Sequence, residues 1–322
     1  MKAHRWMLMS MVGLGLATAE ARAQTWPTKP LRVIVPVAAG STTDIVPRVV
    51  FEQLATQLGQ SIVIENRAGA GTTIGANLVA KADPDGYTIL VNSSAHTIAP
   101  SLYQNLSYHP ARDFAAVIPL GLSPSILVVP PNRGFGIAAE FVAAAKAKPN
   151  ALNFSSVGIG TATHLSAEKF RFSAGIDAVH VPFKGGAEAM TEVIAGRIDF
   201  FFGPVGLVAA NVKEGKLSAL AVNGTKRSAA LPNVPTTSEA GFSNAEYPFW
   251  IGLFLPARTP REIVDKLHGE TLKALQEPKV RDKLATLGMD PMIMSPREFN
   301  AQVEKDIAAD AALGKAIGLK PH

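Results

Sequence analysis

The chain has 322 residues, no Cys, and 31 Lys plus Arg against 26 Asp plus Glu, and 47% of its residues are hydrophobic. Length and hydrophobicity together exclude a largely disordered chain and predict two domains or one large α/β unit. Without Cys the chain forms no disulfide and no Cys-ligated metal site. The basic residues are scattered and lie beside no aromatic stripe, so we expect no nucleic-acid partner.

Residues 1–23 have the basic, apolar and small-residue regions of a secretory signal peptide. Lys2 and Arg5 precede an uncharged apolar segment at 6–19, and Ala21-Arg22-Ala23 offers a cleavage site before Gln24. A membrane anchor is the alternative, but these 14 residues fall short of the about 20 that span a bilayer. We therefore expect a cleaved leader and a mature chain in the periplasm.

From residue 31 the chain repeats one unit, a β-branched run, a loop of Gly, Ser, Thr and Asn, and an amphipathic helix, which predicts βαβ units. Expected strands cover residues 31–36, 62–65, 88–91, 117–120, 125–129, 153–155, 178–181, 199–202 and 217–222. Expected helices between them cover residues 43–58, 74–82, 137–146, 163–172, 188–195 and 205–214. After residue 260 the pattern is helical only, at 261–275, 278–287 and 296–313.

Two stretches, near 121–124 and 243–248, interrupt the βα units and predict two crossings between two lobes joined by a hinge. Residues 24–121 and 246–322 are expected to form lobe 1, with residues 122–245 as an inserted lobe 2. The expected fold class is α/β, each lobe being a mixed sheet flanked by helices, with a cleft between the lobes.

Three loops rich in Gly, Ser and Thr each follow an expected strand and open a helix: the first loop, 37–44, the second loop, 69–75, and the third loop, 156–164. Their backbone N–H groups can accept an anion, while the hydroxyls add donors without fixed charge. Thr42, Thr43, Thr161 and Thr163 can also serve as helix caps, a role compatible with ligand contact. The three loops together predict a carboxylate-binding cleft.

Three charged or titratable residues lie beside these loops, each with two interpretations. Asp44 either orders the first helix or reaches a ligand amine. His164 either donates to a carboxylate or packs locally. Lys184 is a cation between a strand and a helix, and is otherwise a solvated surface lysine.

Catalytic templates are absent from the sequence. We find no Gly-x-Ser-x-Gly elbow, no phosphate-binding Gly-x-x-x-x-Gly-Lys-[Ser/Thr] and no His-Glu-x-x-His. Thr161 with His164 is the nearest nucleophile–base pair, and it has no evident orienting group. We expect no enzyme, no cofactor and no metal, and an exported α/β hydrolase is the alternative.

An ordered series of motifs covers nearly all of the mature chain and resembles one family, the extracytoplasmic solute receptors of tripartite tricarboxylate transporters, also called the Bug family. The motifs are Trp26–Pro30, Val35–Asp44, Glu65–Gly71 followed by Ile74-Gly75, Pro84–Thr88, Gly158–Thr161 with His164-Leu165, His180–Gly185, Gly215–Leu217 and Leu231–Thr236. Any one segment alone would be unspecific, but their order is highly specific.

The resemblance implies a type II periplasmic binding protein that closes around a small carboxylate and presents it to integral membrane transporter subunits. A ligand-sensing role beside a membrane histidine kinase is the alternative partner assignment. The resemblance also implies that backbone amides, hydroxyls and ordered waters hold the carboxylate. We expect a monomer.

Carried over by position, the resemblance implies the following ligand-binding residues. One wall would be lined by Ala38, Ser41, Thr42, Thr43 and Thr72, with Asp44 beside it. The other wall would be lined by Gly158, Gly160, Thr161, His164, Phe183, Lys184 and Ala187, and the floor by Ser93, Ser94 and Gly203.

The chain departs from the family pattern at three of these positions. Ser41 replaces the second Gly of a Gly-Gly-x-x-Asp motif, and Thr72 replaces the last Gly of Gly-Ala-Gly-Gly. Gly203 stands where some members carry an Asp that would meet a ligand amine. Ser41 and Thr72 add polar bulk at the pocket, and Gly203 in place of Asp favours a carboxylate without an amino group.

Overall fold

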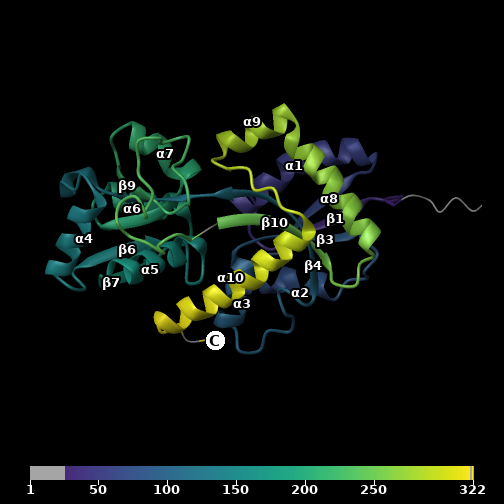
Figure 1. Ribbon diagram of the computed structural model, residues 1–322, viewed down its shortest axis with the longest axis horizontal. Helices are drawn as coiled ribbons and strands as arrows, with labels where there is room; N and C mark the ends of the chain where they lie inside the picture. The colour runs from purple at the N-terminus through teal and green to yellow at the C-terminus, as the bar shows by residue number, and fades with distance from the viewer. Residues whose placement is uncertain (1–25, 248, 320, 322) are drawn as a thin grey trace, which may run out of the picture.

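The computed structural model describes residues 26–247, 249–319 and 321, and the signal-peptide prediction for residues 1–23 lies outside them. The described strands form two five-stranded sheets, each with helices packed on both faces (Figure 1). The α/β fold class with two mixed sheets flanked by helices is therefore confirmed.

The first sheet has the strand order β2-β1-β3-β10-β4. Its strands are β1 (Leu31–Val35), β2 (Ile62–Asn66), β3 (Thr88–Ser93), β4 (Phe114–Ser123) and β10 (Phe249–Pro256). β1 runs parallel to β2 and β3, whereas β10 is antiparallel to β3 and β4. The accompanying helices are α1 (Thr42–Leu58), α2 (Thr73–Ala80), α3 (Ala95–Leu102), α8 (Arg261–Gln276), α9 (Pro278–Thr286) and α10 (Pro296–Ala316).

Alternating strand residues divide the core of this first sheet into two layers. On one face, Val33 and Val35 of β1 pack with residues of α1, α8 and α9. On the other face, Ile34 of β1 packs with residues of α2 and α10. Consecutive apolar residues on β1 are buried because both faces of the strand are covered.

The second sheet has the strand order β7-β6-β8-β5-β9. Its strands are β5 (Ser125–Val129), β6 (Leu152–Ser156), β7 (Ala178–Pro182), β8 (Phe200–Pro204) and β9 (Ser218–Val222), and its helices are α4 (Ala138–Ala147), α5 (Ala162–Ala174), α6 (Gly186–Ile194) and α7 (Val205–Lys213). β6 is parallel to β7 and β8, and β5 is antiparallel to β8 and β9. Phe200 and Phe202 of β8 pack toward α4 and α5, while Phe201 packs toward α6 and α7.

Every expected strand and helix has a counterpart in the structure, with ends that differ by a few residues, but two elements were missed. β10 is one of them, and it lies between β3 and β4 in the first sheet. The other is α3, a short helix directly after β3. Two corrections concern strand ends, since β3 includes Ser93 and β8 includes Gly203, which were expected to follow those strands.

The chain crosses between the sheets twice. β4 ends at Ser123 and β5 begins at Ser125, so the first crossing is Pro124 alone. The second crossing runs from the end of β9 to the start of β10. β4 pairs with β10 up to Ser123, while the lobe boundaries at residues 121 and 246 stay predictions.

Candidate functional site

The two sheets carry the same topological feature at their carboxyl ends. In the first sheet β1 lies between β2 and β3, and the helices that follow β1 and β2 pack on opposite faces. In the second sheet β6 lies between β7 and β8, and α5 and α6 likewise pack on opposite faces. Ligands of open α/β sheets bind at such switch points, outside the carboxyl ends of the strands. The first and third loops lie at these two points.

The strand register brings together the carboxyl edges of the two sheets, which are the edges at which the three loops lie. β4 runs in the same direction as β3, because β10 is antiparallel to both, so Ser123 lies at the carboxyl edge of the first sheet. Ser125 pairs with Pro204, at the carboxyl end of β8. Since only Pro124 separates these two residues, the edges that carry the predicted site residues meet at the first crossing.

The third loop also touches the first sheet's helices directly. A Cβ atom built on Gly160 would lie 2.2 Å from Leu102 Cδ1, so backbone of the third loop packs against the side chain of α3. Gly160 has φ +77° and Gly158 has φ +122°, conformations that favour glycine at both positions. Gly160 therefore allows the loop to approach α3 closely, while Gly158 serves the conformation of the loop itself.

Asp44 holds the first loop together. Its Oδ2 accepts the Gly40 N–H at 2.9 Å, and its Oδ1 accepts Arg48 Nη2 at 2.8 Å and Asn66 Nδ2 at 2.9 Å. Burial opposes ionisation, but the hydrogen bonds from Arg48, Gly40 and Asn66 outweigh it and hold the pKa of Asp44 below its ordinary value. Asp44 thus orders the loop and the first turn of α1.

Thr72 and Ser93 come together at the same edge through Asn92. Thr72 is buried in the left-handed conformation at φ 81°, and its Oγ1 accepts Asn92 Nδ2 at 3.3 Å. Asn92 Oδ1 accepts the Ser93 N–H at 2.8 Å. Ser94, also buried, follows immediately at the start of α3. The second loop and the end of β3 therefore form one polar cluster.

Hydroxyl groups of the third loop turn back onto the loop itself. Thr161 Oγ1 donates to the Gly158 carbonyl at 2.7 Å, and Thr163 Oγ1 accepts the Val157 N–H at 3.0 Å. In the first loop, Ser41 Oγ likewise donates to the Ala38 carbonyl at 3.1 Å. These bonds fix both loops without using the first-turn N–H groups of the helices that follow.

The helices α1 and α5 consequently begin without a side-chain cap. Ser41 and Thr161 occupy the N-cap positions, and neither side chain accepts a hydrogen bond from a backbone N–H of its helix. Other described helices, such as α2 and α6, also begin without a side-chain cap, whereas Ser295 and Glu298 form a complete capping box on α10; the position of α1 and α5 at the loop-bearing edges is what distinguishes them. The 17-residue α1 and the 13-residue α5 thus present unpaired N–H groups and positive dipole ends, an arrangement that binds anions.

The remaining predicted residues lie between β7 and the first turn of α6, and near the end of β8. Phe183 is half-buried, and its N–H donates to the Ser156 carbonyl at 2.8 Å. Lys184 and Ala187 are exposed at the start of α6. Gly203 is buried, and a Cβ there would lie 2.4 Å from Val208 Cγ1. A side chain at Gly203 would therefore have to displace the side chains of Val208 and Phe201.

His164 lies inside the second sheet's lobe, beneath the third loop. Its Nδ1 accepts the Gly160 N–H at 3.2 Å, and its ring centroid lies 4.2 Å from that of His180. His180 Nε2 bonds Ser156 Oγ at 2.6 Å. His180 was not among the residues selected from the sequence, although the motif that contains it was recognised.

Asn223, at the end of β9, was missed as well. It is 1% exposed, its Oδ1 accepts the Ser125 N–H at 2.8 Å, and its Nδ2 donates to Ser166 Oγ at 2.7 Å and to the Tyr247 carbonyl at 3.3 Å. It therefore ties the two crossings together. A single Asn directly after the apolar run Leu220–Val222 was the available signal.

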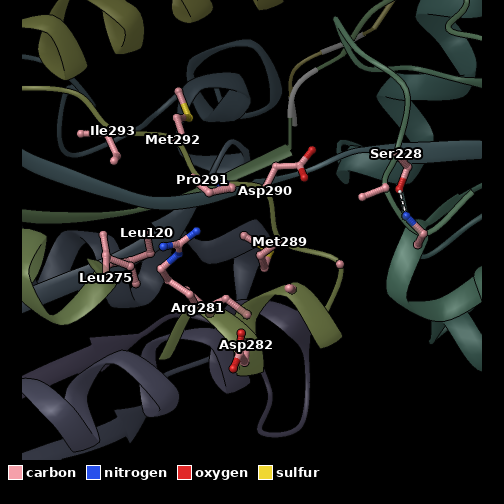
Figure 2. Close-up of a pocket in the computed structure, with 15 residues that line it drawn as sticks. Leu120, Ser228, Leu275, Arg281, Asp282, Met289, Asp290, Pro291, Met292 and Ile293 are labelled. Atoms are coloured by element: carbon pink, nitrogen blue, oxygen red, sulfur yellow. Dashed lines mark hydrogen bonds between the residues drawn. The ribbon is translucent and has the colours of Figure 1, made fainter. Parts of the chain in front are cut away.

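A pocket of about 250 Å³ lies elsewhere, between α8, α9, residues 288–293 and residues 228–230 (Figure 2). Apolar side chains such as Leu120, Leu275 and Met289 line it, and the Arg281 guanidinium points among them. None of the predicted ligand-binding residues lines this pocket. The pocket is thus separate from the paired loops.

Two further observations limit the chemistry of the part of the chain that the structure describes. Within residues 26–247, 249–319 and 321, no three His, Asp or Glu side chains are grouped to hold a metal ion. No helix in the same ranges is long and apolar enough to cross a membrane.

Comparison with known proteins identifies close relatives of this fold and sequence. A family model described as "Tripartite tricarboxylate transporter family receptor" matches residues 46–319. The periplasmic binding protein BugD is 31% identical in sequence, with a TM-score of 0.79 over 92% of this chain and 100% of that chain.

Two similar structures hold ligands. The R. palustris protein Rpa4515, solved with adipate, is 31% identical, with a TM-score of 0.82 over 92% of this chain and 100% of that chain. MatC from Rhodopseudomonas palustris, solved with bound malate, is 32% identical, with a TM-score of 0.78 over 89% of this chain and 99% of that chain.

Proposed function

The chain belongs to the tripartite tricarboxylate transporter family of receptors, which are binding proteins rather than enzymes, and on that premise we propose that it captures a small organic carboxylate in the periplasm. The carboxylate binds between the lobes, at the first, second and third loops. The loaded receptor then delivers it to integral membrane subunits of a tripartite tricarboxylate-type transporter.

The observation that carries this proposal is the pair of uncapped helices, one from each sheet. α1 and α5 begin at loops on facing edges, and neither Ser41 nor Thr161 caps its helix. An anion that contacts both helix ends stabilises the closed arrangement of the lobes selectively, which is the requirement for ligand-driven closure. Adipate and malate, the ligands of two relatives, each carry two carboxylates that could serve two such ends.

Two features favour a carboxylate that lacks an amino group. Asp44 already bonds Gly40, Arg48 and Asn66, so its oxygens are engaged within the first loop. Gly203 leaves no space for an acidic side chain near α7. A ligand ammonium group would therefore find no carboxylate partner at these two positions.

Adding a negative charge at the N-cap of each helix tests the site. Aspartate is a good N-cap residue, so Ser41→Asp and Thr161→Asp should leave the helices folded and equally or more stable. The new carboxylate would occupy the helix end and repel an anionic solute. Isothermal titration of residues 24–322, refolded to remove retained ligand, should show at least a tenfold loss of adipate or malate affinity, roughly 1.4 kcal/mol.

Ser295→Asp is the matched control, because it changes the N-cap of α10, away from both loops. It should leave affinity unchanged. Equal affinity in all three variants would refute the site. Tight binding of amino acids with no binding of their deaminated analogues would refute the ligand class, and turnover of small esters would support the hydrolase alternative.

A further inference from the structure

The His164 ring is held in one protonation state by its contact with the third loop. The Gly160 N–H points at Nδ1 from 3.2 Å, and a backbone N–H only donates. Nδ1 must therefore be unprotonated, which places the proton of the neutral ring on Nε2. That nitrogen lies 3.7 Å from Glu168 Oε1.

The hydrogen bond from the Gly160 N–H to His164 Nδ1 affects the site because Gly160 contacts α3 and precedes α5. The residue adopts φ +77°, and its backbone packs so closely on Leu102 of α3 that a Cβ has no room. The next residue, Thr161, is the N-cap of α5. Moving Gly160 would therefore move the start of α5 and its contact with the other lobe.

The surroundings of His164 oppose its protonation. The charged and titratable groups that face it are Glu168 and Arg171 on α5 and His180 on β7, with Arg171 Nη1 bonded to both Glu168 oxygens at 2.8 Å. Burial, then His180 and Arg171, lower the pKa of His164 to about 3. Burial and Arg171 likewise lower the pKa of His180 to about 4, and burial raises the pKa of Glu168 despite Arg171.

We infer that His164 is a positioning residue for solute binding: its Nδ1 lone pair fixes the Gly160 turn against α3 and keeps the first turn of α5 aligned with the solute. The inference rests on the proposed function. Protonation would bring an Nδ1–H against the Gly160 N–H, two donors facing each other, so the turn would be released. Because the ring is harder to protonate when folded than when unfolded, the folded state loses stability as pH falls below about 6.5, whereas the ring in the folded protein stays neutral and holds the turn until pH approaches about 3.

Two substitutions separate the lone pair from the charge. In His164→Asn the amide Oδ1 lies near the position of Nδ1, accepts the Gly160 N–H and does not titrate at these pH values. In His164→Phe the ring shape stays and the acceptor is lost. His268→Asn is the control. His268 lies on α8, and its Nε2 bonds the Met294 carbonyl, so this variant makes the same substitution away from the third loop.

The first measurement uses no solute: amide hydrogen exchange and ring ¹⁵N shifts of the refolded mature chain between pH 4 and 8. We expect Gly160 to be protected in wild type and in His164→Asn, and to exchange about tenfold faster in His164→Phe. Unchanged Gly160 exchange in His164→Phe would overturn the inference, whether or not any solute binds.

The second measurement is adipate affinity between pH 5 and 8. We expect wild type and His164→Asn to bind alike across this range, because the folded ring stays neutral, and His164→Phe to bind about tenfold more weakly at pH 7. Equal affinities of His164→Phe and wild type, or binding of His164→Asn as weak as that of His164→Phe, would overturn the role of the lone pair. If Gly160 responds as expected but no dicarboxylate binds, the proposed function fails and the positioning contact stands.

Discussion

The buried amide of Asn223 joins the two crossings, so its removal should weaken the connection between the lobes more than an ordinary polar substitution does. Asn223→Ala deletes the acceptor of the Ser125 N–H and the donor to the Tyr247 carbonyl, bonds of 2.8 and 3.3 Å. It also deletes the 2.7 Å bond to Ser166, whose hydroxyl can rotate to another partner.

The magnitude follows from the two backbone groups left without partners. Asn223 is only 1% exposed, so water reaches neither group without local opening. A buried polar group without a partner costs about 1–3 kcal/mol, which gives a loss of about 2–4 kcal/mol in unfolding free energy after partial relaxation. Such a loss should lower the urea midpoint while the slope stays constant.

Urea unfolding at pH 7, followed by tryptophan fluorescence, measures this loss. Asn233→Ala is the matched control, because Asn233 is exposed within the same excursion between β9 and β10. The control should change stability by less than about 0.5 kcal/mol. A loss below about 1 kcal/mol for Asn223→Ala would refute the reasoning that the amide ties the crossings.

Asn223→Asp sharpens the test by keeping the shape and the acceptor for Ser125. Its second oxygen would face the Tyr247 carbonyl, so the folded state should disfavour the carboxylate and raise its pKa. The folded state then binds more protons than the unfolded chain, so the penalty should shrink as pH falls. A penalty that grows toward acid pH would contradict this geometry.

Burial raises the pKa of Asp310 on α10 to about 7, so wild-type stability should fall as pH rises from about 4 to 7, and urea midpoints for Asp310→Asn should be flatter over that range. Gly206→Ala should weaken adipate binding with little change in stability, since its Cβ would lie 2.6 Å from the Leu287 carbonyl and separate α7 from α9. Gly269→Ala is its control, having nothing within 4 Å, and should raise stability by about 0.5–1 kcal/mol through helix propensity without changing affinity.

Local patterns were sufficient for most of the fold, and the two missed elements show where such patterns fail. β10 is apolar throughout and seven of its eight residues are buried, because helices cover both faces of the first sheet. Such a strand has no alternation to recognise. α3 has only eight residues and contains Pro100, so its helical period is too short to stand out.

The candidate site likewise has a part that local sequence patterns predict and a part that they do not. The loops were found because Gly, Ser and Thr cluster after strands, a local property of the sequence. The residues that position them come from far along the chain: Asn66 bonds Asp44 across 22 positions, and Asn223 bonds Ser125 across 98. No spacing rule predicts such partners, because they are set by the strand order of the folded sheets.

The two lobes touch through an apolar cluster, in which Leu165 of α5 packs with Ile98 and Leu102 of α3, and through two close glycine contacts. Gly160 approaches Leu102, and Gly206 approaches the Leu287 carbonyl so closely that neither glycine has room for a Cβ. The apolar cluster stabilises this arrangement with or without a solute, because burial of apolar area does not depend on a bound anion. The first turns of α1 and α5 lie at the same edges with their N–H groups uncapped, so an anion reaching both adds a favourable term that exists only when the lobes approach. Closure should then depend mainly on the charge and length of the solute, because the glycine contacts limit how closely the two helix ends can approach.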